Sequence, residues 1–200
     1  MKIYDVSQSI PDCEIYPGDP GPEIKRLSSI DCGDLYNLTS FSMCAHNGTH
    51  IDAPFHFIKN GKTVDNIPLF KTVGVALVVE CNGKIDSNKA LKIISGFKTV
   101  SNETIRKILL KGACVVTEDG ARSFVDEGIH LIGSETQSVG DEKAPMAVHK
   151  ILLEKEVVLL EGIRLENVNE GVYFLVAAPI SISGSDGAPC RAILIEFDGE

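Results

Sequence analysis

The chain of 200 residues contains no tryptophan, and aromatic residues make up only 6% of it. A binding site walled by many aromatic rings is therefore not expected, although Tyr16, Phe41, Phe55 and Phe57 could supply some of its wall. Runs of basic residues are also missing, and the net charge is -9. Because a phosphate backbone attracts a basic face, this charge argues against nucleic acid as a partner.

Long hydrophobic runs are missing as well. The most apolar segments, such as Val73 to Val79, are about eight residues long, whereas a membrane-spanning helix needs about 20. The N-terminus carries Asp5 and lacks the apolar stretch of a signal peptide. The six cysteines form no C-x-x-C pair, which argues against a cysteine zinc site or redox motif. We therefore expect a cytoplasmic protein with free thiols that contacts no membrane.

What remains is typical of one globular domain spanning residues 1–200, with 44% hydrophobic and 24% charged residues. Strand-like segments dominate, and three segments have helical signals. We predict an α/β domain that is mixed and strand-rich, and not a clean doubly wound sheet. The predicted helices are Ser101–Leu110, Ala121–Asp126 and Ala144–Lys155. The predicted strands are Ile3–Val6, Leu35–Cys44, Val73–Glu80, Ala113–Thr117, His130–Gly133, Val157–Glu161, Val172–Ala178 and Ala192–Phe197.

Three of the five histidines fall within eleven residues, in His46-Asn47-Gly48-Thr49-His50-Ile51-Asp52-Ala53-Pro54-Phe55-His56. Imidazole and carboxylate groups are ligands that zinc prefers, and manganese tolerates them too. In an extended strand His46 and His50 would be about 13 Å apart, too far to share a metal. A tight bend with positive φ at Gly48 would bring them together. The pattern predicts a metal site, with polar residues of an ordinary turn as the alternative.

His46, His50 and Asp52 suffice for a first set of ligands. His56 is then free to act as a general acid or base, since its usual pKa lies near neutrality. A closed structural zinc site, with Cys44 or His56 as fourth ligand, is the alternative from a different class of protein. His149 in a predicted helix and Glu161 at a strand end are weaker candidate ligands, because an apolar-flanked carboxylate is costly to bury unpaired. His130 is expected to be a core or edge histidine.

Residues 46–56 match the pattern H-x-G-T-H-x-D-x-P-x-H, and the chain thereby resembles the Putative cyclase family, which includes bacterial kynurenine formamidase and isatin hydrolase. Further segments are similar to the family in the same order along nearly the whole chain. These segments are Tyr16-Pro17-Gly18-Asp19-Pro20, His149 followed by Glu161, and Gly187-Ala188-Pro189-Cys190-Arg191-Ala192. Glu135 stands where family members usually carry an aspartate.

The resemblance implies a β/β/α fold and a homodimer or larger homo-oligomer. It implies two metal ions, most simply zinc, with His46, His50 and Asp52 holding the first. Asp52 would bridge to a second ion held by His149 and Glu161. His56 would be the catalytic base of a hydrolase that acts on a small-molecule amide, such as N-formylkynurenine or a cyclic amide. A lactonase or a dehydratase-like cyclase on the same site is the alternative reaction.

Overall fold

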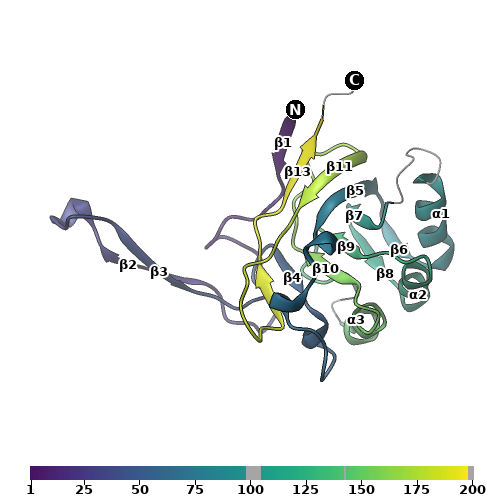
Figure 1. Cartoon of the computed structure of the whole chain (residues 1–200), viewed down its shortest axis with the longest axis horizontal. Coiled ribbons are helices and arrows are strands. Elements are labelled where there is room, and N and C mark those ends of the chain that lie inside the picture. The colour runs from purple at the N-terminus through teal and green to yellow at the C-terminus, as the bar shows by residue number, and fades with distance from the viewer. Residues whose placement is uncertain (98–104, 142, 198–200) are drawn as a thin grey trace.

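The computed structural model describes residues 1–97, 105–141 and 143–197. Its centre is a curled, mixed nine-stranded sheet (Figure 1). Strands β5, β7, β9 and β10 run parallel in the middle, and the strands outside them pair antiparallel. In spatial order the strands are β1 (Lys2–Asp5), β13 (Ile193–Glu196), β11 (Gly171–Val176), β5 (Val73–Glu80), β7 (Lys107–Lys111), β9 (Leu131–Ser134), β10 (Val158–Glu161), β4 (His50–Asp52) and β12 (Gly187–Pro189).

Three helices lie together beside the parallel strands of the sheet (Figure 1). They are α1 (Ser87–Phe97), α2 (Glu118–Asp126) and α3 (Met146–Leu153). A two-stranded sheet of β6 (Gly83–Ile85) and β8 (Cys114–Val116) lies near them. Short 3-10 turns cover Ile30–Cys32, Pro54–His56, Val64–Asn66 and Leu69–Lys71. The strand-rich α/β fold class predicted from the sequence is confirmed, and none of the described helices is long and apolar enough to cross a membrane.

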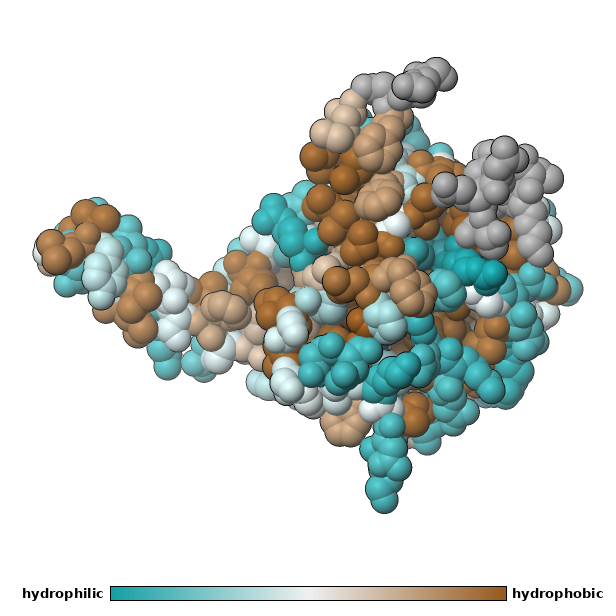
Figure 2. All heavy atoms as spheres, in the orientation of Figure 1, coloured by the Kyte–Doolittle hydropathy of each residue, from teal (hydrophilic) through white to brown (hydrophobic). Residues whose placement is uncertain are grey.

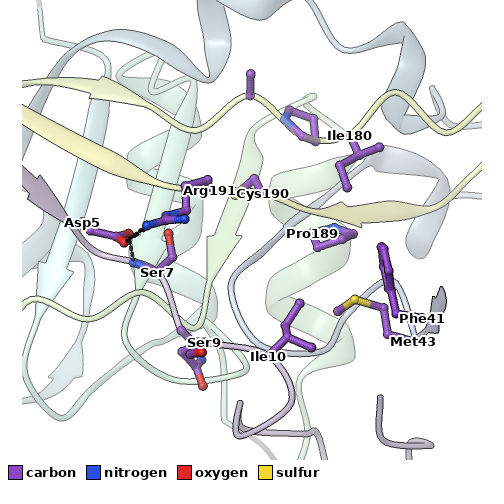
Figure 3. Close-up of a pocket in the computed structure, with 13 residues that line it drawn as sticks. Asp5, Ser7, Ser9, Ile10, Phe41, Met43, Ile180, Pro189, Cys190 and Arg191 are labelled. Atoms are coloured by element: carbon purple, nitrogen blue, oxygen red, sulfur yellow. Dashed lines mark hydrogen bonds and ion pairs between the residues drawn. The ribbon is translucent and has the colours of Figure 1, made fainter. Parts of the chain in front are cut away.

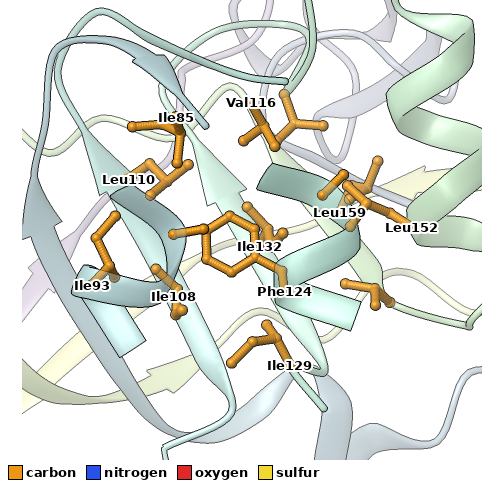
Figure 4. Close-up of a cluster of buried hydrophobic side chains, with 14 of the residues drawn as sticks. Ile85, Ile93, Ile108, Leu110, Val116, Phe124, Ile129, Ile132, Leu152 and Leu159 are labelled. Carbon is orange, nitrogen blue, oxygen red and sulfur yellow. The ribbon is translucent and has the colours of Figure 1, made fainter. Parts of the chain in front are cut away.

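Two hydrophobic clusters fill the two faces of the sheet. Phe124 of α2 is fully buried at the centre of the cluster under the helices (Figure 4). Ile108 and Leu110 of β7 point into that cluster, whereas Leu109 points into the cluster on the opposite face. A strand buried on both faces reads as a continuous apolar run. Strand β7 therefore carries little of the alternation by which half-buried strands are recognised.

The predicted helix Ser101–Leu110 is wrong where it can be compared with the structure. Residues 101–104 lie outside the described residues, and Lys107–Lys111 form β7. A short apolar run fits a buried strand as well as a helix, and here sheet pairing on both sides decided the outcome. The helix of this region lies earlier, at α1, where Ala90, Ile93 and Ile94 have helical spacing and are buried. The other two predicted helices are confirmed as α2 and α3, with ends shifted by a few residues.

A long hairpin of β2 (Glu23–Ser28) and β3 (Leu38–Ser42) projects far from the body (Figure 1). Its surface is unusually apolar, and Figure 2 shows hydrophobic side chains gathered near its tip. Leu35 is 95% exposed, and Tyr36 and Phe41 are each 58% exposed. A two-stranded hairpin has no core of its own and is marginal in water. The hairpin is therefore a surface that would gain stability from being covered.

Candidate metal centre

Strand β4 presents two predicted ligands on one face of the sheet. Because alternate residues of a strand point to opposite faces, His50 and Asp52 share a face, whereas Ile51 is fully buried in the core on the other side. Both polar side chains are 1% exposed. Charged groups buried this deeply need partners, which must come from neighbouring elements.

Three neighbouring segments supply those partners. Strand β10 pairs with β4 so that Glu161 lies opposite His50. Helix α3 brings in His149, which is 3% exposed. The turn before β4 brings in His46, and the bend with positive φ predicted at Gly48 is confirmed, with φ of 64°.

Asp52 lies at the centre of the group. Its Oδ1 is 2.9 Å from His46 Nδ1 and 3.4 Å from His50 Nε2. Its Oδ2 is 3.7 Å from His149 Nε2, and that nitrogen is also 3.3 Å from Glu161 Oε1. Glu161 Oε2 is in turn 3.6 Å from His50 Nε2. The structure thus brings all five predicted ligands together as two sets of three that share Asp52.

The donor atoms of this group fit divalent metal ions. His50 donates from Nδ1 to the Gly48 carbonyl at 2.9 Å, and His149 donates from Nδ1 to the Pro145 carbonyl at 2.8 Å. Each bond fixes the proton on Nδ1 and leaves the lone pair of Nε2 free to coordinate a metal ion. In both histidines Nε2 faces the carboxylates. Asp52 Oδ2 is buried without a hydrogen-bond partner in the part of the chain that the structure describes. An orphaned carboxylate oxygen 3.7 Å from the His149 Nε2 is a position that a cation would satisfy.

The carboxylates strongly raise the pKa values of the neighbouring histidines. Burial lowers the pKa of His50, but the interactions with Asp52 and Glu161 outweigh it and raise that pKa to about 9. Burial likewise opposes charge on His149, yet Glu161 and Asp52 raise its pKa to about 9. Although burial alone would raise the pKa of Asp52, the neighbouring histidines hold it well below its usual range. Without metal, protons on the imidazoles therefore balance the buried carboxylates.

Asp186, which sequence reasoning did not single out, joins a predicted ligand to the predicted base. Its Oδ2 accepts a hydrogen bond from His46 Nε2 at 2.8 Å and another from His56 Nδ1 at 3.1 Å. Asp186 directly precedes β12, which pairs with β4. The next residue must be small, because a Cβ at Gly187 would lie 2.7 Å from His46 Cε1. Asp186 lies 140 positions from His46 along the chain, and no local pattern in the sequence marked it as a partner.

Four of the five predicted ligands line a cavity of about 420 Å³, whereas Asp52 is too deeply buried to be among its lining residues. His56 and Cys44 reach it, but Cys44 belongs to none of the described ligand sets, and its Sγ lies 3.9 Å from Asp19 Oδ2. His130 lies apart from the cavity beside Phe70, with ring centroids 5.4 Å apart. The lining residues are Tyr16, Asp19, Cys44, His46, His50, His56, Phe57, Gln137, Ser138, Pro145, His149, Glu161 and Asp186.

A larger cavity of about 660 Å³ lies near the base of the hairpin (Figure 3). Its walls include Ile10, Phe41 and Met43 and contain no histidine. Its carboxylate, Asp5, is already paired with Arg191, whose Nε donates to it at 2.9 Å. The smaller cavity is therefore the candidate site, because it contains four of the five predicted ligands.

The family model described as Putative cyclase matches residues 4–109, more than half of the chain. A kynurenine formamidase of Salinibacter ruber is 32% identical over 208 residues, covering 97% of this chain and 97% of that protein. The chain belongs to the cyclase family. Among solved structures, a potential metal-dependent hydrolase with cyclase activity has a TM-score of 0.81 at 29% identity, covering 99% of both chains. Isatin hydrolase A of Labrenzia aggregata shares the fold, with a TM-score of 0.82 at 21% identity, over 98% of this chain and 94% of that one.

Within this cyclase-family chain, Glu135 lies away from the cavity with the histidines. Its Oε2 accepts a hydrogen bond from the Gly112 backbone N–H at 2.7 Å, and its Oε1 accepts one from the Leu165 N–H at 2.8 Å. The longer side chain thus joins the loops after β7 and β10. Glu135, which replaces the family's usual aspartate, thus accepts hydrogen bonds from two backbone N–H groups and does not reach the cavity with the histidines.

Proposed function

We propose that this chain is a metal-dependent hydrolase that cleaves the amide bond of a small molecule, as an arylformamidase does on N-formylkynurenine, or the bond of a related cyclic amide. The observation that carries the proposal is the pair of ligand sets that share Asp52, whose other four members line one cavity. Similarity to a kynurenine formamidase at 32% identity over nearly the whole chain supports the same reaction.

The ligands would divide between two ions. His46, His50 and Asp52 would hold one, and Asp52, His149 and Glu161 would hold the other. Nitrogen and oxygen donors suit zinc first and also manganese. When bound, such ions polarise a carbonyl oxygen and lower the pKa of water.

His56 performs the proton transfers in this proposal. Its side chain is 27% exposed at the cavity, and its Nδ1 donates to Asp186. This bond leaves Nε2 as the nitrogen that can accept a proton from water and then return it to the leaving nitrogen of the amide. Asp186 orients the ring, as a carboxylate behind a catalytic histidine does.

The cavity also provides evidence on the alternative of a closed structural zinc site, which the sequence did not exclude. A structural site uses four protein ligands and admits no substrate. Here four of the five ligand groups line a cavity of about 420 Å³, and Cys44 belongs to none of the described ligand sets. His56 shares a set only with His46 and Asp186, apart from His50 and Asp52. These features favour an open, catalytic site.

The test combines metal analysis with hydrolysis of N-formylkynurenine, isatin and simple lactones by the metal-loaded protein. We expect up to two ions per chain and turnover of the amides. His56→Ala should bind metal normally and lose about 100-fold or more in kcat, whereas His130→Ala, outside the cavity, should keep full activity. Turnover of lactones alone would favour the lactonase alternative, and full activity of His56→Ala would contradict the role of His56.

The assembly proposed from the family resemblance is a homodimer or larger homo-oligomer. The exposed apolar hairpin supports it, because Leu35 and Tyr36 would lose contact with water if a second copy covered them. Light scattering after size-exclusion chromatography tests this point. A monomer at micromolar concentration would contradict it, and a Leu35→Ser, Tyr36→Ser double variant should weaken the assembly.

A further inference from the structure

Two cysteines lie side by side at one end of the hydrophobic cluster under the helices. The Sγ atoms of Cys81 and Cys114 are 3.1 Å apart, and both thiols are free. Neither residue is among the described residues that line the cavity with the histidines. Because 33 positions separate the two cysteines along the chain, the fold itself brings their sulfur atoms together.

The backbone around the pair is fixed by strand pairing and close packing. The Cys81 N–H donates to the Lys111 carbonyl at 2.8 Å, and Gly83 pairs with Cys114, the first residue of β8. Gly112 has φ of 106°, and a Cβ there would lie 2.4 Å from the Cys81 carbonyl oxygen. The loops after β5 and β7 are therefore in direct contact, and this contact holds the two sulfur atoms in place.

The two thiols differ in reactivity. The Cys81 S–H donates to Cys114 Sγ, and this bond lowers the pKa of Cys114; burial opposes the shift, and the charge of Lys89 adds to it. The same bond raises the pKa of Cys81. Lys89 is held close to the pair, because its Nζ donates to the Asn82 carbonyl at 2.6 Å. Since the thiolate is the reactive form of cysteine, Cys114 is the nucleophile of the pair.

The pair lies directly beneath the surface. Cys81 is 5% exposed and Cys114 is 3% exposed, but their chain neighbours Asn82 and Ala113 are exposed. Gly112 and Ala113 also line a surface cavity of about 640 Å³. A molecule as small as hydrogen peroxide needs only a slight opening of these loops to reach the sulfur atoms, whereas a bulky disulfide needs a larger one.

We propose that Cys81 and Cys114 form a redox-sensitive pair, which hydrogen peroxide oxidises to an intramolecular disulfide. The Cys114 thiolate attacks one peroxide oxygen and the O–O bond breaks, which gives a sulfenic acid and a hydroxide that takes up a proton. The Cys81 sulfur then loses its proton and attacks the Cys114 sulfur, and the S–O bond breaks to release a second water. Two thiols and one peroxide thus give one disulfide and two waters, with both sulfurs oxidised and both peroxide oxygens reduced.

The disulfide would tie together loops that support one wall of the fold. The Val116 N–H at the end of β8 donates to the Val139 carbonyl at 3.0 Å, and the Val139 N–H donates to Glu161 Oε1 at 2.7 Å. A crosslink across 33 positions restricts the unfolded chain, so it should stabilise the folded protein. The inference goes beyond the proposed hydrolase function and does not depend on it.

Peptide mapping of the metal-loaded protein after treatment with hydrogen peroxide tests the proposal. We expect a peptide that contains Cys81 to be linked to one that contains Cys114, and the link to be lost on reduction with dithiothreitol. Cys190 is the internal control and should stay free, because burial raises the pKa of its thiol to about 12. Absence of the link, or oxidation of Cys190 as fast as Cys114, would overturn the proposal.

Thermal unfolding gives a second measurement that needs no substrate. The Tm of the linked protein should be about 5 to 10 °C above that of the reduced protein. Cys81→Ala, treated with peroxide in the same way, should show no such rise, and its Cys114 should instead carry a sulfenic or sulfinic acid, detected by mass. An unchanged or lower Tm in the linked protein, or an equal rise in Cys81→Ala, would contradict the proposed pair.

Discussion

Replacing Asp186 by asparagine should weaken metal binding and catalysis together. The carboxylate Oδ2 accepts hydrogen bonds from His46 at 2.8 Å and from His56 at 3.1 Å. Asparagine keeps the size of the side chain and an acceptor oxygen, but it loses the negative charge that strengthens both hydrogen bonds. One substitution therefore disturbs a predicted metal ligand and the predicted base at once.

The size of the effect follows from those two bonds. A hydrogen bond to a charged group contributes about 1.5–3 kcal/mol. The side chain of Asp186 is 41% exposed, so solvent screening places the loss near the lower end of this range. We expect kcat to fall about tenfold, and metal affinity to fall about 10- to 100-fold because His46 loses its orienting partner.

Chelator competition measures metal affinity, and kcat is then measured with metal in excess. Asp5→Asn is the control, since Asp5 is a partly exposed carboxylate paired with Arg191 outside the cavity with the histidines. Its metal affinity and kcat should be unchanged. Asp186→Asn with wild-type affinity and wild-type kcat would refute the reasoning that this carboxylate positions the two histidines.

Three further outcomes are expected. Glu161→Gln should reduce the metal content from two ions to one per chain, measured by elemental analysis, because it removes a carboxylate from one ligand set and leaves the other intact; unchanged stoichiometry would contradict the two sets. Metal affinity, measured by chelator competition, should rise between pH 7 and pH 9. The pKa values of His50 and His149 are raised to about 9, and a metal ion must displace those protons, which are lost more easily as pH increases. A flat profile would contradict this. Phe124→Ala should lower the free energy of unfolding in urea by about 3–5 kcal/mol, because it leaves a cavity in the core, while the metal content of the folded protein stays the same.

The segment 46–56 shows how far the sequence alone could lead. Within these eleven residues, the ligand types, the bend at Gly48 and the separate position of His56 could all be predicted, because the geometry of a short segment is set mostly by its own backbone. His149 and Glu161 were weaker predictions. Each lies on a regular element, and whether that element faces the cluster depends on how the sheet and α3 pack.

The strand β7 shows where local reasoning failed. Its run of Ile108, Leu109 and Leu110 was predicted as part of a helix, whereas α1, the helix of this region, was not predicted. Burial on both faces removes the alternating pattern of a strand, and only the neighbouring strands β5 and β9 decide that the segment is extended.

By itself, then, the sequence determined the kind of chemistry, since the close spacing of histidine and aspartate around a glycine bend is a local property. The tertiary structure decided which distant groups complete it. Antiparallel pairing on β4 places Glu161 on one side and the segment after Asp186 on the other. These contacts join residues more than a hundred positions apart along the chain. Their closeness comes from sheet register and packing, which a local pattern cannot encode.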